Sequence, residues 1–309
     1  MKLVFGLKNV SNLALNECLE PLFVTGQSMF MIKEFISKNS TYKSRLQSFC
    51  LVLEETLTSW NTIILDIEQK LIASEEGLTL IELAELLLVK LENVEWVVRL
   101  LDDYSNANYT HLFNSVVELC EITSHLQNSS LHGMIKNLLV AISVEYFEEL
   151  EIWLMKGLLS EDSFFMVKQH DSVFQLEKLD QIPTLFHGMC DSILIGGIRA
   201  EMSKRLYLQI PLLEAHQAFK SAIKNQDLSK IPISAVVNVC FQSTIVQHTQ
   251  CVETILYKHV LCNSNLKFHD TFLQIKGFYL LQKRCTINAF MRLLFEKVKI
   301  DTLYHLIQP

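Results

Sequence analysis

The sequence predicts an all-α protein made of antiparallel helical bundles in an elongated arrangement, and three observations support this fold class. Half of the 309 residues are hydrophobic, which excludes a disordered chain. Only 9 glycines and 5 prolines are present, too few for a sandwich or barrel with many tight turns. Apolar residues recur at helical spacing, whereas no convincing stretch alternates with period two.

In the N-terminal segment, residues 1–41, the sequence predicts only short helices. One is expected over residues 12–20 and another over 28–37, because Pro21 and Gly26 separate them. We treat this segment as distinct from the bundle that follows it.

Residues 42–73 carry the strongest helical signal in the chain. Eight apolar residues recur there at intervals of 4, 3, 4, 3, 4, 3 and 4. They are Leu46, Cys50, Leu53, Leu57, Trp60, Ile64, Ile67 and Leu71. Such a heptad seam is typical of a long helix that packs lengthwise against partners, and its short length favours an intramolecular bundle over a free coiled coil.

The later helices are delimited by caps, glycines and prolines. Thr79 and Glu82 have the spacing of a capping box. The pair Gly196-Gly197 lies inside a predicted helix and indicates a close helix–helix approach or a kink. These helices are expected over residues 79–101, 109–126, 131–156, 183–207, 234–261, 268–282 and 286–298, with a loop over 102–108 and a break allowed near Val144.

The stretch FEELEIWLMKGLLSEDSFFMV, residues 147–167, combines a helix, a helix end and an aromatic cluster. The helix is expected to stop at Gly157, because glycine tolerates the left-handed conformation of a helix end. Burial of Trp153 and the two following phenylalanines can contribute about 1.5–3 kcal/mol per side chain. We interpret five residues as a structural motif without a catalytic role: Trp153, Gly157, Phe164, Phe165 and Pro183.

Cysteines and histidines near the C-terminus form a candidate zinc pattern. They are Cys240, His248, Cys251, His259 and Cys262, spaced by 8, 3, 8 and 3 residues along one helix face. A tetrahedral site needs four ligands, so either His/Cys pair would need another element, and only His187/Cys190 offers an obvious second pair. We therefore favour a core stripe of thiols and histidines, and we expect no metal and no cofactor.

Asp102-Asp103 resembles the start of the acidic motif with which all-α isoprenoid synthases hold magnesium. Asn106 occupies the position where that motif needs another acid, and no second carboxylate cluster is evident. Phosphate-binding loops and hydrolase motifs are also missing from the sequence. We therefore expect a protein that is not an enzyme, with a solvated helix end at these aspartates.

The charge and the cysteines of the sequence indicate which classes of partner and which cellular compartment to expect. The net charge of −7 disfavours a nucleic-acid partner, and no apolar run is long enough for membrane insertion. Eight cysteines without CxxC pairs indicate free thiols in a reducing, cytosolic compartment. Residues 43–165 hold 7 Lys/Arg against 20 Asp/Glu, a net charge of −13, whereas residues 266–301 hold 7 against 3, a net charge of +4. This asymmetry indicates either ordinary solvated faces or two different neighbours.

The order of these features resembles the gamma-tubulin complex component family, whose members build the ring that nucleates microtubules. The similar segments are residues 44–71, 78–101, 129–159, 182–200 and 273–298, so the resemblance extends from about Tyr42 to the end. Three departures mark a divergent member: Glu145-Tyr146 stands where the family has Pro-Tyr, the turn after Gly157 is shorter and lacks proline, and Lys283-Arg284-Cys285 replaces a Gly-Asp pair.

The resemblance implies a division of labour along the chain. Residues 42–228 would form the N-terminal bundle that contacts other complex components laterally, and residues 229–309 would begin the region that binds gamma-tubulin. Because the chain ends soon after that region begins, the resemblance implies a truncated member, fragment or incomplete gene model with weakened gamma-tubulin contact.

The expected role is structural: microtubule nucleation by a gamma-tubulin complex in the cytoplasm, at a microtubule-organising centre or spindle pole of the cytoskeleton. Two alternatives stay open. One is an unrelated all-α adaptor or tethering protein that binds partner helices. The other is an all-α enzyme that depends on Asp102 and Asp103.

Overall fold

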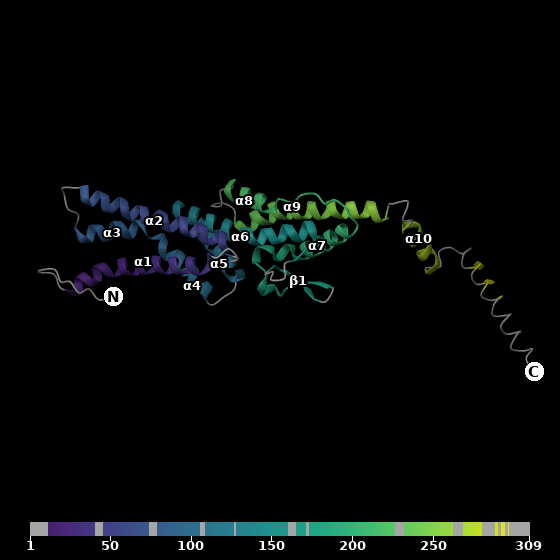
Figure 1. Ribbon diagram of the computed structural model, residues 1–309, viewed down its shortest axis with the longest axis horizontal. Helices are drawn as coiled ribbons and strands as arrows, with labels where there is room; N and C mark the ends of the chain where they lie inside the picture. Colours follow the sequence, from purple (N-terminus) through teal and green to yellow (C-terminus); the bar gives the residue numbers. More distant parts are fainter. Residues whose placement is uncertain are drawn as a thin grey trace, which may run out of the picture. The chain divides into compact units, whose positions relative to one another are not determined.

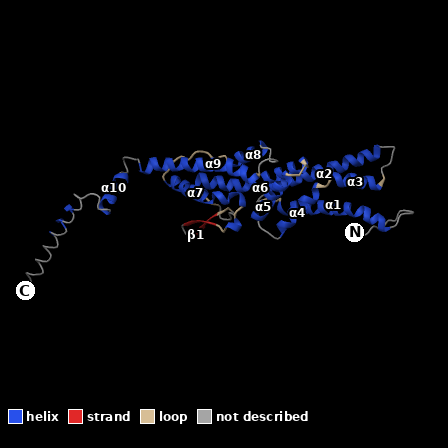
Figure 2. Cartoon of the chain, turned by 180° about the vertical axis from the view of Figure 1, so that it is seen from behind, coloured by secondary structure: helices blue, strands red, loops and turns tan. Residues whose placement is uncertain are grey.

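The computed structural model describes residues 12–40, 46–73, 79–105, 109–126, 128–159, 165–170, 173–225, 232–261 and 268–279, together with residues 288–289, 292–293 and 296. Within these residues the regular secondary structure is helical apart from one pair of short strands (Figure 1 and Figure 2), so the predicted all-α class is confirmed. The elements are α1 (Asn12–Asn39), α2 (Gln47–Ala73), α3 (Leu80–Lys90), α4 (Asn93–Ser105), α5 (Tyr109–Ser124), α6 (Ser129–Lys156), β1 (Val167–His170), β2 (Val173–Leu176), η1 (Leu179–Gln181), η2 (Thr184–Met189), α7 (Cys190–Arg205), α8 (Ala215–Asn225), α9 (Ile233–Leu256), η3 (Tyr257–Leu261) and α10 (Phe268–Tyr279).

Two compact units make up the chain, Met1–Thr249 and Gln250–Pro309. The domain division that the sequence places between residues 228 and 229 stays a prediction. No described helix has both the length and the apolar character that crossing a membrane requires.

The helix α1 is continuous over 28 residues, so the two short helices expected from the sequence are wrong. Pro21 lies inside α1, although a proline in a helix interior costs about 3 kcal/mol. The buried side chains Leu15 and Ile32 lie on opposite sides of this proline along the helix, and α1 packs against α2, α3 and α4. Packing on both sides of Pro21 therefore outweighs its local cost.

The helix α2 carries the predicted heptad seam on its inner side. Leu46, Cys50, Leu53, Trp60 and Ile67 are buried, and Leu57, Ile64 and Leu71 are half-buried. This side of α2 faces a core to which α1 and α6 contribute, and both helices contact α2. The prediction of an intramolecular bundle seam is confirmed.

The single helix expected over residues 79–101 is two helices. Its predicted capping box is present: the Glu82 N–H donates to the Thr79 hydroxyl at 3.3 Å, and the Thr79 N–H donates to the Glu82 carboxylate at 2.9 Å. The chain then turns at the buried Leu91. The turn allows α3 to pack against α1 while α4 packs against both α1 and α5. One straight helix would not supply these separate contacts.

A β-hairpin that the sequence did not indicate follows α6. Strands β1 and β2 pair antiparallel, with Val167 opposite Leu176 and His170 opposite Val173. Strands of four residues are too short to show a period-two pattern. The helix expected from Pro183 to Tyr207 starts instead with the 3₁₀ turn η2 and continues as α7.

The C-terminal helices follow the predicted order. The helix expected over residues 234–261 is α9, and its last turn, η3, is π-helical. Helix α10 lies within the expected range 268–282. The helix expected over 286–298 falls largely outside the described residues.

The helix α6 occupies the centre of the first unit. It packs against α2, α5, α7 and α8 and buries 12 of its 28 residues; in Figure 1 its label lies between those of α5 and α8. The break allowed near Val144 does not occur. Glu145 lies inside α6 and keeps the backbone N–H that an unbroken helix needs.

Glu145 also links α6 to the beginning of α2. The Ser48 N–H, in the first turn of α2, donates to a Glu145 carboxylate oxygen at 3.1 Å. First-turn N–H groups have no partner within their own helix, and a carboxylate there interacts favourably with the helix dipole. The other carboxylate oxygen is buried and accepts no hydrogen bond from the described residues. Burial raises the pKa of Glu145 above its ordinary value, the Ser48 N–H opposes the shift, and Glu148 adds to it.

The raised pKa predicts a specific pH dependence of stability. Because the folded state holds the Glu145 proton more tightly, this group's contribution is fully present below its unfolded pKa of about 4.3 and is lost as pH rises through the folded pKa. Glu145→Gln removes this ionisation, so its free energy of unfolding relative to the native chain should rise between acidic and neutral pH. Urea unfolding of both proteins across this pH range measures the difference; a difference independent of pH would contradict the prediction.

Candidate functional site

Trp153 fixes the crossing of α6 and α7. Its side chain is fully buried, and its indole Nε1–H donates to the Ile193 carbonyl oxygen at 2.9 Å. A Cβ atom placed on Gly197 would lie 1.8 Å from Trp153 Cε2. A side chain at this position would therefore overlap the indole ring unless the ring or the helix moved. The close approach predicted from the glycine pair is therefore confirmed, and the indole ring occupies the space that the missing side chain leaves.

Gly157 ends α6 beside the same crossing. It has a left-handed conformation with φ of 60°, and its N–H donates to the Trp153 carbonyl oxygen at 2.9 Å. An added Cβ would meet the backbone N of Glu201 in α7 at 2.4 Å. Both conformation and close approach thus require glycine here.

The hairpin covers the outer side of the tryptophan. Phe174 of β2 packs edge-on against Trp153, with ring centroids 4.9 Å apart and an interplanar angle of 61°. The hairpin also contacts α7 through β2. Trp153 therefore joins three elements, α6, α7 and β2, through one side chain.

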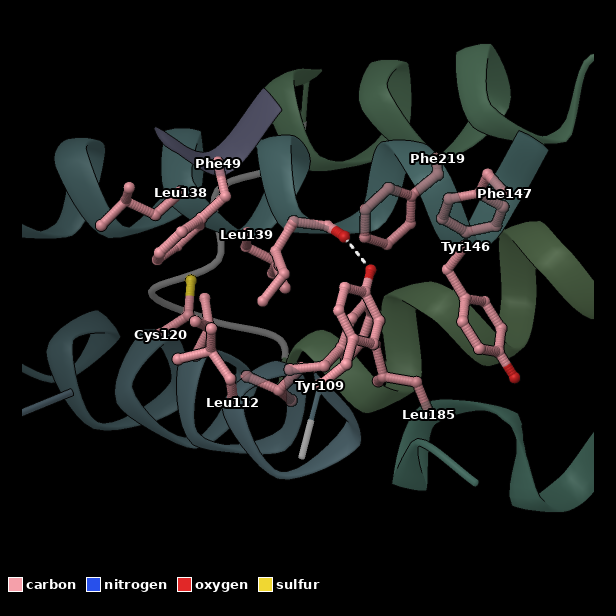
Figure 3. Packing of buried hydrophobic residues seen from close by; sticks show 14 of the residues in the cluster. Phe49, Tyr109, Leu112, Cys120, Leu138, Leu139, Tyr146, Phe147, Leu185 and Phe219 are labelled. Carbon is pink, nitrogen blue, oxygen red and sulfur yellow. Dashed lines mark hydrogen bonds between the residues drawn. The ribbon is translucent and has the colours of Figure 1, made fainter. Parts of the chain in front are cut away.

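A second group of aromatic rings fills the space between α6, η2 and α8. Tyr146 stacks on Phe186 with centroids 4.7 Å apart, and Phe165 approaches Tyr146 to 5.3 Å. The ring centroids of Phe147 and Phe219 are 5.0 Å apart, and the two rings lie next to each other in Figure 3. Aromatic pairs of this kind contribute about 0.5–1.5 kcal/mol beyond burial. These rings connect segments that are far apart in the sequence.

Tyr109 ties the first residue of α5 to α6. Its hydroxyl donates to the Ile142 carbonyl oxygen, the dashed line in Figure 3. Burial raises the pKa of Tyr109 well above its ordinary value, with Glu145 as a further cause. The hydroxyl therefore stays protonated at neutral pH and remains a donor.

The structure buries four of the five predicted motif residues, and Trp153 and Phe165 belong to the same hydrophobic core. Trp153, Phe165, Gly157 and Pro183 are buried, whereas Phe164 lies outside the described residues. Phe165 contacts Tyr146, and the aromatic neighbour of Trp153 is Phe174. Pro183 precedes η2, and its carbonyl oxygen accepts the Phe186 N–H at 2.9 Å. Their role as a motif stays a prediction.

Several aromatic partners of this motif carry no distinguishing pattern in the sequence. Phe174 lies in a strand that was not predicted, and Tyr146, Phe147 and Phe186 are ordinary apolar positions in their segments. Only Gly196-Gly197 pointed to the correct contact. A resemblance based on residue order could not identify which rings meet.

The histidines and cysteines of the zinc pattern are engaged elsewhere or exposed. His248 Nε2 lies 3.2 Å from the Pro211 carbonyl oxygen, and burial lowers the pKa of His248. His187 Nε2 lies 2.9 Å from the Ile182 carbonyl oxygen. Cys251 and His259 are exposed, while Cys262 and the side chain of Cys240 lie outside the described residues. Among the described residues, no three histidines, cysteines or acids are grouped so that they could hold a metal ion.

Asp102 lies within α4 and is exposed, because α4 continues to Ser105 beyond the start of the expected loop. The side chain of Asp103 lies outside the described residues. Nothing among the described carboxylates forms a facing cluster for magnesium. The enzyme hypothesis therefore gains no support from α4.

The buried thiols belong to the core. Burial raises the pKa of Cys50 to about 11 and that of Cys120 to about 12. Cys190 is also buried, and its thiol donates to the Phe186 carbonyl oxygen at 3.3 Å. Such protonated, enclosed thiols are poor nucleophiles and metal ligands.

Comparison with protein-family models identifies the family to which the chain belongs. Residues 1–208 match the family model for the gamma tubulin complex component N-terminal region. No curated protein matches the chain. The match covers two thirds of the sequence and includes α1 to α7, the Trp153 crossing and the hairpin.

The crossing predicts unequal effects of two identical substitutions. Gly197→Ala should lower the free energy of unfolding by about 3 kcal/mol or more, because the new methyl group overlaps the indole. Gly133→Ala in α6 meets open space and should raise it by about 0.5–1 kcal/mol. Urea titration followed by tryptophan fluorescence measures both; equal shifts for the two variants would contradict the proposed packing.

Proposed function

Because the chain belongs to the gamma-tubulin complex component family, we propose that it is a structural component of a gamma-tubulin complex and contributes to microtubule nucleation. The observation that carries this proposal is the family match over residues 1–208. The matched region folds as a packed helical unit whose core shows no metal cluster among its described residues. We propose that the protein acts by holding other subunits at defined positions, and that it catalyses no covalent reaction.

Rigid packing supports this role in physical terms. A nucleation template must hold its subunits at microtubule spacing before the filament exists. The entropy cost of ordering those subunits is therefore met when the complex assembles, and not during nucleation. In the first unit α6 contacts four other helices, and the Trp153 crossing locks it to α7. Close-packed interiors of this kind transmit position with little deformation.

We assign partners by region within this proposal. Residues 42–228 associate laterally with other complex components, and residues from 229 onward begin the gamma-tubulin-binding part. The protein acts in the cytoplasm as part of the cytoskeleton, at a microtubule-organising centre or spindle pole. It binds no nucleic acid, in keeping with its net charge of −7.

The test is recovery of partners from cells that express the tagged native chain. Gamma-tubulin and other complex components should co-purify with the native chain and with Gly133→Ala, which leaves the core intact. Gly197→Ala should lose both, because it disrupts the α6–α7 crossing. Immunoblotting for gamma-tubulin and mass spectrometry of the eluate measure recovery. The proposal fails if the folded native chain recovers neither.

A further inference from the structure

The helix α2 has a second apolar stripe, and it is exposed in the part of the chain that the structure describes. We define the outer stripe as Leu51, Thr58, Leu65 and Ile72, four residues spaced by seven. Seven residues advance a helix by nearly two turns, so these positions share one side and extend over about 30 Å. Leu51, Leu65 and Ile72 are 53%, 54% and 80% exposed, respectively. In Figure 1 and Figure 2 the C-terminal end of α2 lies at the upper edge of the first unit.

The one polar member of the outer stripe is satisfied inside its own helix. The Thr58 hydroxyl donates to the Glu54 carbonyl oxygen at 2.8 Å. The Thr58 hydroxyl proton is therefore already hydrogen-bonded within α2, so an apolar partner helix would leave no donor unsatisfied. Three large aliphatic side chains and this threonine thus offer a partner helix a mainly apolar seam.

Carboxylates flank the outer stripe. Glu54, Glu55, Asp66 and Glu68 are exposed on α2, and none forms an ion pair with a described lysine or arginine. Lys70 is the single basic residue of α2, so the helix carries a net charge of −3. Glu54 and Glu68 each follow a stripe leucine by three residues, which places them beside it on the helix surface.

From this pattern we propose that the outer stripe docks an amphipathic helix of another protein, with an aliphatic residue at every seventh position and lysines or arginines at the flanks. The apolar residues supply the area, and the acidic flanks select a basic partner and disfavour an acidic one. The inference uses only the surface of α2 and does not depend on the proposed role in microtubule nucleation.

The test uses the full chain and two synthetic helical peptides of about 25 residues, enough to follow the stripe. Both peptides carry leucine at every seventh position; one has lysine at the flanks and the other has glutamate. The lysine peptide should bind the native chain about tenfold or more tightly than the glutamate peptide, and added salt should weaken it. Fluorescence anisotropy measures both affinities. Equal binding of the two peptides would overturn the proposal.

The variant L65D/I72D separates apolar docking from simple charge attraction. It adds two negative charges, so attraction by charge alone would make the lysine peptide bind more tightly. Docking through the stripe predicts the opposite, a loss of about tenfold or more. The matched control Gln69→Asp adds charge at an exposed position of the same helix and should keep native affinity or exceed it.

Two further measurements keep the inference testable. If L65D/I72D fails to fold by circular dichroism, E54K/E68K replaces it and should shift the preference of the chain from the lysine peptide to the glutamate peptide. Sedimentation velocity of the native chain tests a second copy as the occupant. A dimer that L65D/I72D abolishes would overturn the basic partner in favour of self-association.

Discussion

The insertion of Trp153 over Gly197 is the contact on which the first unit depends. It brings α6 and α7 so close that one helix must lack a side chain, and the indole N–H satisfies a carbonyl oxygen of the other. Gly157 ends α6 at the same place, where α7 again approaches too closely for a Cβ. The hairpin then closes over the ring through Phe174. Removing the glycine or the indole would separate three elements together.

The same helix joins this crossing to the N-terminal bundle. Trp153 lies near the C-terminal end of α6, whereas Glu145 meets the start of α2 and Ile142 meets α5. An interrupted α6 could not hold these contacts in a fixed relation. Glutamate at position 145 therefore couples two parts of the core at the cost of burying a carboxylate.

Features with a local cause could be predicted from the sequence, and features set by packing could not. The heptad seam of α2, the capping box at Thr79 and the helix end at Gly157 follow from spacing and residue chemistry within a few turns. The continuity of α1 through Pro21 and the turn at Leu91 depend on helices that are distant in the sequence. The candidate site divides in the same way. Trp153 and the glycine pair were visible, but Phe174 was not, because its strand has four residues and forms by pairing with β1.

Two sides of α2 carry different apolar patterns, one that stabilises the fold and one that we propose for docking. Its inner seam is buried against α1 and α6 and fixes the helix in the unit, while the outer stripe repeats every seven residues in solvent. Solvent-facing aliphatic residues at single positions are ordinary, but a regular repeat flanked by exposed carboxylates is the pattern on which the proposed docking of a partner helix rests. A protein that holds other subunits at defined positions needs a rigid interior, because the interior fixes where its surface contacts lie. The proposed docking also needs an exterior pattern, and α2 carries the buried seam and the outer stripe on two different sides.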